Sequence, residues 1–105
     1  MKFTIVRSRR FTRDIEDFTQ YASAYSEAFF LDQFARLNKV LTVDLADKPG
    51  TWNYFFLTGA PYRAYLFRVG RRTSYWIVYR IDQTARRVDL LRFWNASRQT
   101  ETFEI

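Results

Sequence analysis

Arginine is the residue type in this chain that is best able to do chemistry. Nine arginines, no lysine and two acidic residues lie between Tyr62 and Arg98, among runs of Tyr, Trp, Phe, Val and Ile that are typical of strands. A guanidinium group binds phosphate and carboxylate bidentately and also stacks on aromatic rings. The stretch therefore predicts a surface for an anionic partner, either phosphate or an acidic protein.

The positive charge is concentrated in the second half of the chain. Residues 1–52 hold eight basic and seven acidic groups, residues 53–105 hold nine and four, and the whole chain carries a formal charge of +6. A second interpretation remains open: a basic surface without a specific partner, in which genomic base composition favours arginine.

Several kinds of catalysis are excluded by composition. The chain has no cysteine and no histidine, which rules out disulfides, cysteine zinc sites, thiol nucleophiles and Ser-His-Asp chemistry. Arginine stabilises transition-state charge but is a poor proton carrier. The other groups of this half able to move a proton are Tyr62, Tyr65, Asp89, Glu101 and Glu104. We expect no metal and no cofactor.

A single domain, residues 1–105, must position these groups. Alternation over residues 2–8 predicts a short strand. Apolar residues spaced four and three apart then predict two helices that form an antiparallel hairpin, with Thr12 and Ser26 as N-caps. The first apolar stripe is Phe11, Ile15, Phe18, Ala22 and Tyr25, and the second is Phe30, Phe34, Leu37 and Leu41.

Three further strands are predicted over residues 62–69, 74–81 and 86–94. Residues 52–57 fit either a loop or a strand, and Phe103 and Ile105 are expected to dock as an extra strand or a half-turn. The fold class is α+β in the order β-α-α-β-β-β, with a two-helix hairpin packed on one face of an antiparallel, mostly meander sheet. Tyr75, Ile77, Tyr79 and Ile81 should face the helices, whereas Trp76 and Arg80 should lie with neighbouring arginines on an open, concave face.

The segments 65–70 (YLFRVG), 75–82 (YWIVYRID) and 88–94 (VDLLRFW) resemble the RelE/ParE toxin superfamily, whose members show an R-x-G-x-Y-R-h-x-Y-x-h-D hairpin and a V-x-h-L-x-h-x-H-x-R strand. The resemblance implies the toxin of a bacterial type II toxin–antitoxin pair. RelE-like members cut messenger RNA in the ribosomal A site, ParE-like members poison DNA gyrase, and a small antitoxin wraps around both.

Carried over by position, the resemblance suggests Arg68, Arg80 and Arg98 as catalytic residues. The target-binding residues would be Arg63, Arg71, Arg72, Trp76, Arg92 and Trp94, although both tryptophans also fit a buried core. The chain departs from the family in three places. Trp76 stands where a basic residue is frequent, Trp94 or Asn95 where many members have histidine, and Phe103 where some nucleases have a catalytic tyrosine.

The missing proton-transfer groups favour a ParE-like gyrase poison that binds an anionic target and inhibits growth. Two alternatives stay open: a ribosome-dependent endoribonuclease, and an inert domain that binds only the antitoxin. The expected partners are a cognate antitoxin, docked in a groove beside the helices or on a sheet edge, and either the ribosome with its mRNA or DNA gyrase. No apolar run reaches eighteen residues and the first residues are soon charged, so we expect no membrane association, no signal peptide and a cytoplasmic protein.

Overall fold

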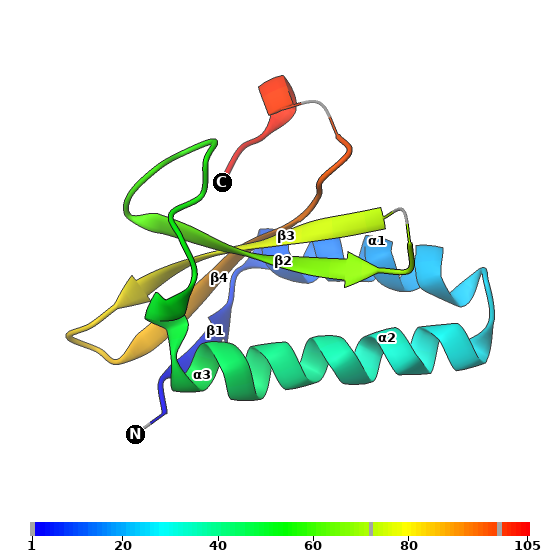
Figure 1. The fold of residues 1–105 in the computed structure, drawn as a ribbon, viewed down its shortest axis with the longest axis horizontal. Coiled ribbons are helices and arrows are strands. Elements are labelled where there is room, and N and C mark those ends of the chain that lie inside the picture. The colour runs from blue at the N-terminus through cyan, green and yellow to red at the C-terminus, as the bar shows by residue number, and fades with distance from the viewer. Residues whose placement is uncertain (1, 72, 99) are drawn as a thin grey trace.

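The computed structural model describes residues 2–71, 73–98 and 100–105 and has the predicted α+β order (Figure 1). The strands are β1 (Thr4–Arg7), β2 (Tyr62–Val69), β3 (Thr73–Asp82) and β4 (Arg87–Asn95). The long helices are α1 (Arg9–Ser23) and α2 (Glu27–Lys39), and α2 continues through a π-helical turn, Val40–Asp44, into the short α3 (Leu45–Asp47). Among the described residues, no helix is long and apolar enough to cross a membrane.

The sheet has the strand order β1-β4-β3-β2. β2, β3 and β4 form the predicted antiparallel meander. β1 instead runs parallel to β4, with Thr4 opposite Arg87 and Arg7 opposite Leu90, so the sheet is mixed. A β-bulge interrupts the β3–β4 register at Val78 and Tyr79. β2 is left as one edge of the sheet.

The two long helices begin at serine caps. The Ser26 hydroxyl accepts a hydrogen bond from the Phe29 amide, as predicted, and thereby satisfies a free donor of the first turn. The predicted cap of α1 at Thr12 is wrong, because Ser8 performs this role through the Phe11 amide and the helix begins earlier. The last residue of the first predicted stripe, Tyr25, lies beyond the end of α1 and is exposed.

Both helices pack on one face of the sheet. Phe11 and Phe18 of α1 meet Ile77, Tyr79 and Phe93 of the strands in a single core. Burying side chains of this size contributes about 1.5–3 kcal/mol each. The hydroxyl of Tyr79 donates to the carbonyl of Pro49, which ties the 3-10 turn Pro49–Thr51 to the underside of the sheet. The prediction that this face of β3 meets the helices is confirmed.

The opposite face of the sheet has a smaller core of its own. Phe55, Ala64 and Val78 are buried there, with Trp76 and Phe103 packed against them. Residues 52–57, whose sequence fits either a loop or a strand, form a loop that is joined to β2 by one bridge between Tyr54 and Arg63. This loop and the C-terminal tail lie on the side of the sheet away from α2 (Figure 1). They cover much of the face that was expected to be open.

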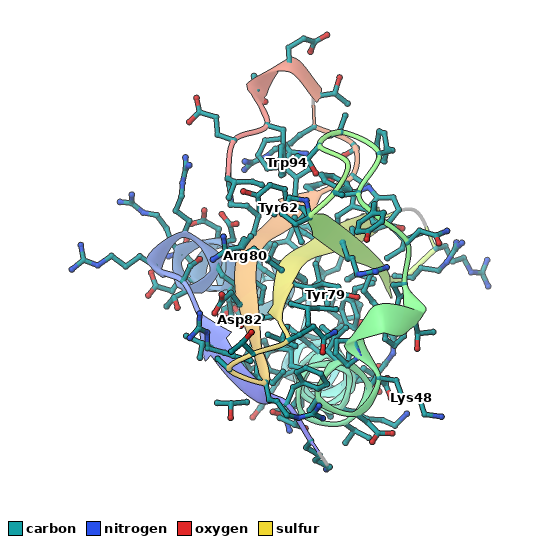
Figure 2. All side chains as sticks on the ribbon, turned by 90° about the vertical axis from the view of Figure 1, so that its left-hand side faces the viewer. Lys48, Tyr62, Tyr79, Arg80, Asp82 and Trp94 are labelled. Atoms are coloured by element: carbon teal, nitrogen blue, oxygen red, sulfur yellow. The ribbon has the colours of Figure 1, made fainter. Side chains whose placement is uncertain are left out.

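The tail forms a half-turn, which is one of the two arrangements expected. A 3-10 turn spans Thr100–Thr102, and the ring of Phe103 then lies 5.1 Å from that of Phe55 and 5.0 Å from that of Trp94. The guanidinium of Arg10 holds the chain end by donating to the Ile105 carbonyl at 2.8 Å. Figure 2 shows Trp94 on the side of the sheet that carries this tail and Tyr79 on the opposite side.

Candidate functional site

Arg68 and Arg80 lie on the same face of the sheet but at opposite ends of it. Arg68 is opposite Ser74, whereas Arg80 is opposite Tyr62. Arg80 lies six positions beyond Ser74 along β3, which corresponds to about 20 Å at about 3.3 Å per residue. One scissile phosphate cannot contact both side chains at that separation.

Arg80 belongs to an alternating network of charges at the β3–β4 hairpin. Its Nη2 lies 3.3 Å from Asp89, and Arg87 contacts Asp89 at 2.7 Å and Asp82 at 3.4 Å. The hydrogen bond from Arg87 holds the pKa of Asp89 below its ordinary value. The guanidinium of Arg80 is therefore balanced by a carboxylate of its own chain.

Arg98 lies in a third place, beyond the end of β4. Its guanidinium is 5.3 Å from the ring of Trp94, and it lines a hollow of about 250 Å³ with Tyr75 and Asn95. Burial raises the pKa of Tyr75, so its hydroxyl stays protonated near neutral pH and is no general base. The expectation that the strand arginines converge on one concavity is wrong, because Arg68, Arg80 and Arg98 occupy three separate environments.

Two of the arginines predicted to bind the target are engaged by groups of their own chain. Arg92 is 6% exposed, and its Nε donates to Asp14 at 2.8 Å. Arg63 donates to the Trp52 carbonyl at 2.7 Å and lies 4.3 Å from the ring of Tyr54. Trp94 is also buried, at 4% exposed, in agreement with the core alternative for this tryptophan.

An aromatic hollow of about 350 Å³ lies on the sheet face opposite the helices. Its lining consists of Trp52, Asn53, Tyr54, Phe55, Phe56, Ala64, Leu66 and Trp76. Phe56 and Tyr54 are strongly exposed, at 68% and 51%, and the Phe56 ring lies 5.8 Å from that of Trp76. Exposed rings of this kind stack on bases or anchor a protein partner.

Two exposed arginines follow this hollow along the chain. Arg68 lies two residues beyond Leu66 on the same face of β2, and Arg71 lies in the β2–β3 hairpin. Neither side chain has a hydrogen-bond, ion-pair or ring partner among the described residues. Arg72 lies outside the described residues. The aromatic hollow, Arg68 and, at the hairpin end of β2, Arg71 are hereafter called the aromatic–arginine face.

A basic groove of about 390 Å³ runs between α2 and the β2 edge. Arg36, Lys39 and Arg68 line it, with Asp44 as its acidic residue. The outward backbone groups of Tyr62 and Ala64 bond the 53–59 loop. By the alternation of an antiparallel pair, Leu66 and Arg68 also point outward, and no such partner exists for them within the described chain. This part of the edge is open to an added strand.

Residues that sequence reasoning missed lie at the start of the chain. Arg7, Arg9 and Arg13 are exposed and, within the described chain, have no side-chain partner. The signal was present, since four arginines fall between residues 7 and 13. This cluster did not stand out in the net charge, because seven acidic residues in positions 1–52 nearly cancel the eight basic ones.

Within the described parts of the chain, no group of three or more acidic, histidine or cysteine side chains is placed to hold a metal ion. No protein-family model matches the chain, and no curated protein matches it either. The function is therefore inferred from the fold and from the positions of the side chains.

Proposed function

We propose that this chain is the toxin of a bacterial type II toxin–antitoxin pair of the RelE/ParE kind. In this proposal it arrests growth by binding an anionic macromolecule, with a gyrase-directed activity favoured over RNA cleavage. The aromatic–arginine face carries the proposal, because it combines exposed rings with the guanidinium groups of Arg68 and Arg71, which have no partner in the described chain. The order β-α-α-β-β-β and the net charge of +6 agree with it.

The separation of Arg68, Arg80 and Arg98 favours binding over cleavage. In-line cleavage of RNA needs a base, an acid and charge stabilisation around one phosphate. Arg80 is paired with Asp89 at 3.3 Å, and Tyr75 beside Arg98 has a raised pKa. A nuclease centre built from these three arginines would require a large rearrangement.

The basic groove beside β2 supports an acidic antitoxin as partner. An extended acidic segment there would meet Arg36, Lys39 and Arg68 and could add backbone hydrogen bonds at Leu66 and Arg68. Such a segment would cover Arg68 of the aromatic–arginine face at the same time. Antitoxin binding and target binding would then exclude each other.

Induced expression in a bacterial host tests the proposal. Growth should stop. The proposal also predicts an adjacent small reading frame for an acidic antitoxin, and co-expression of that protein should restore growth. Accumulation of cleaved DNA–gyrase complexes is expected, whereas codon-phased cuts in mRNA would identify a ribosome-dependent nuclease instead. Growth that continues normally at full expression of folded protein would contradict the toxin proposal and leave the inert, antitoxin-binding alternative.

The double variant Arg68→Ala/Arg71→Ala tests the face itself. Both side chains are exposed and have no partner among the described residues, so stability should change by no more than about 0.5 kcal/mol. Growth arrest should weaken. The matched control, Lys2→Ala/Lys48→Ala, also removes two exposed charges and should leave growth arrest intact.

A further inference from the structure

The junction of β1 and α1 carries a second concentration of unpaired positive charge. Arg7 is the last residue of β1, and Arg9 and Arg13 lie in the first turns of α1. All three side chains are exposed, and the described chain supplies them no hydrogen-bond, ion-pair or ring partner. They line one open hollow of about 400 Å³ together with Ser8, Thr12 and Glu16.

The local structure holds these guanidinium groups near one another. Residues four apart on a helix lie on the same face, so Arg9 and Arg13 are neighbours one turn apart. The cap at Ser8, whose hydroxyl also donates to the Leu91 carbonyl at 3.1 Å, anchors the start of the helix to β4. Arg7 precedes that cap directly. The positive end of the α1 dipole adds to the potential at the same place.

Little negative charge opposes the three arginines. Glu16 is the acid that lines the hollow. Asp14, on the same helix, is engaged with Arg92 and with the Phe93 amide. The guanidinium of Arg10 does not line the hollow, because it contacts the Glu104 carboxylate at 3.4 Å and donates to the Ile105 carbonyl. Three guanidinium groups therefore share the hollow with one carboxylate.

The lining of the hollow discriminates between classes of partner. No apolar side chain contributes to it among the described residues. The buried centre of a protein–protein interface is typically enriched in apolar and aromatic residues, whereas interfaces with nucleic acid are more polar and strongly positive. The absence of a stacking ring in this lining also removes the means to read single-stranded bases. Backbone phosphate is the ligand that these groups fit.

We infer that Arg7, Arg9 and Arg13 form a phosphate-contacting surface that binds the backbone of a nucleic acid without reading its sequence. The three residues lie outside the aromatic–arginine face, and the inference holds whether or not the chain is a toxin. It assigns a concentration of unpaired charge, among the described residues, to the junction of β1 and α1, away from strands β2–β4.

A salt titration with matched variants tests this surface. The probe is a short, fluorescent, mixed-sequence RNA duplex, and its binding to the full chain is followed by anisotropy. Arg7→Ala/Arg9→Ala/Arg13→Ala should bind at least about tenfold more weakly, and the slope of log K against log salt should become shallower by about 2–3. The control Lys2→Ala/Lys48→Ala removes two exposed charges, as does the double variant Arg9→Ala/Arg13→Ala. Of these two variants, only the lysine control should retain most of the slope.

Two further variants sharpen the test. Arg7→Lys/Arg9→Lys/Arg13→Lys keeps the charges and should keep most of the salt slope. Glu16→Gln removes the opposing carboxylate of the hollow and should tighten binding about two- to tenfold. Because these side chains are exposed, thermal unfolding should be nearly unchanged in every variant, which excludes misfolding as the cause of a loss.

Three results would overturn the inference. The first is no binding of the duplex by the wild-type chain. The second is an equal loss in the arginine and lysine double variants, since only net charge would then matter. The third is stronger, arginine-dependent binding to polyglutamate or to phosphatidylserine vesicles than to RNA, which would reassign the surface to an acidic protein or a lipid. Failure of the toxin proposal is read from growth and affects none of these outcomes.

Discussion

The guanidinium of Arg92 on β4 and the carboxylate of Asp14 on α1 form a two-point contact across 78 positions of the chain, with Nε–Oδ2 at 2.8 Å and Nη2–Oδ1 at 3.3 Å. Oδ2 also accepts a hydrogen bond from the Phe93 amide at 2.9 Å. β1 pairs with β4 only as far as Leu90, so beyond that point the Asp14 carboxylate takes the place of a neighbouring strand. The third guanidinium nitrogen of Arg92, Nη1, donates to the Glu104 carbonyl and thereby holds the C-terminal tail.

Arg92→Ala should lower the free energy of unfolding by about 3–5 kcal/mol, because it leaves the Asp14 carboxylate partly buried without its cation. Urea denaturation measures this loss. Arg10→Ala removes an ion pair whose side chains are 50% and 76% exposed, and it should cost less than about 1 kcal/mol. Equal losses in the two variants would show that the Arg92 contact is no more important than a surface pair.

Tyr79→Phe should destabilise the fold by about 1–3 kcal/mol, because the Pro49 carbonyl loses its buried donor while the ring remains in the core. Thermal or urea unfolding measures the change. Tyr25→Phe is the matched control, since that hydroxyl is on a side chain 67% exposed, and its effect should be within about 0.5 kcal/mol. An unchanged free energy of unfolding in Tyr79→Phe would contradict a stabilising role for this hydrogen bond.

Asp89→Asn should lower the melting temperature at neutral pH and lose this effect in acid. The hydrogen bond from Arg87 holds the pKa of Asp89 below its ordinary value. A lowered folded-state pKa contributes stability above the unfolded-state pKa, and that contribution disappears as pH falls through the folded-state pKa. The gap between wild type and variant should therefore narrow below about pH 4. Melting curves recorded across this range check it, and a gap independent of pH would contradict the charge network.

Phe55 and Phe56 are neighbours whose substitutions should have opposite consequences. Phe55 is 1% exposed in the smaller core, whereas Phe56 is 68% exposed at the aromatic hollow. Phe55→Ala should cost about 3–5 kcal/mol. Phe56→Ala should change stability by no more than about 0.5 kcal/mol but weaken growth arrest in the expression assay. Full growth arrest by Phe56→Ala would remove this ring from the proposed target surface.

Local pattern was sufficient for most of the elements. The spacing of Phe11, Ile15, Phe18 and Ala22 predicts the buried face of α1, and alternation in β3 predicts which side meets the helices. Local pattern does not predict which strand β1 pairs with, or in which direction. Its four residues pair with a strand more than eighty positions later, and a short alternating run carries no information about the direction of its partner.

The candidate site was less accessible to sequence reasoning than the fold. In the sequence, a dense run of positive charge lies between Tyr62 and Arg98. Asp14, Asp89 and the Trp52 carbonyl engage Arg92, Arg80 and Arg63 of that run. At Arg7, Arg9 and Arg13, where the nearby acids made the sequence look balanced, the guanidinium groups have no partner among the described residues.

The amino-acid sequence by itself determined the total charge, the apolar stripes, the alternating faces of the strands and the absence of histidine and cysteine. Tertiary structure decided which guanidinium groups are neutralised and which remain available to a partner. The physical reason is that a charge is compensated by groups within a few ångströms of it, and in a folded chain those groups come from any distance along the sequence. Asp14 compensates Arg92 of β4 and not Arg9 or Arg13 of its own helix, and this pairing exists only once α1 is packed against β4.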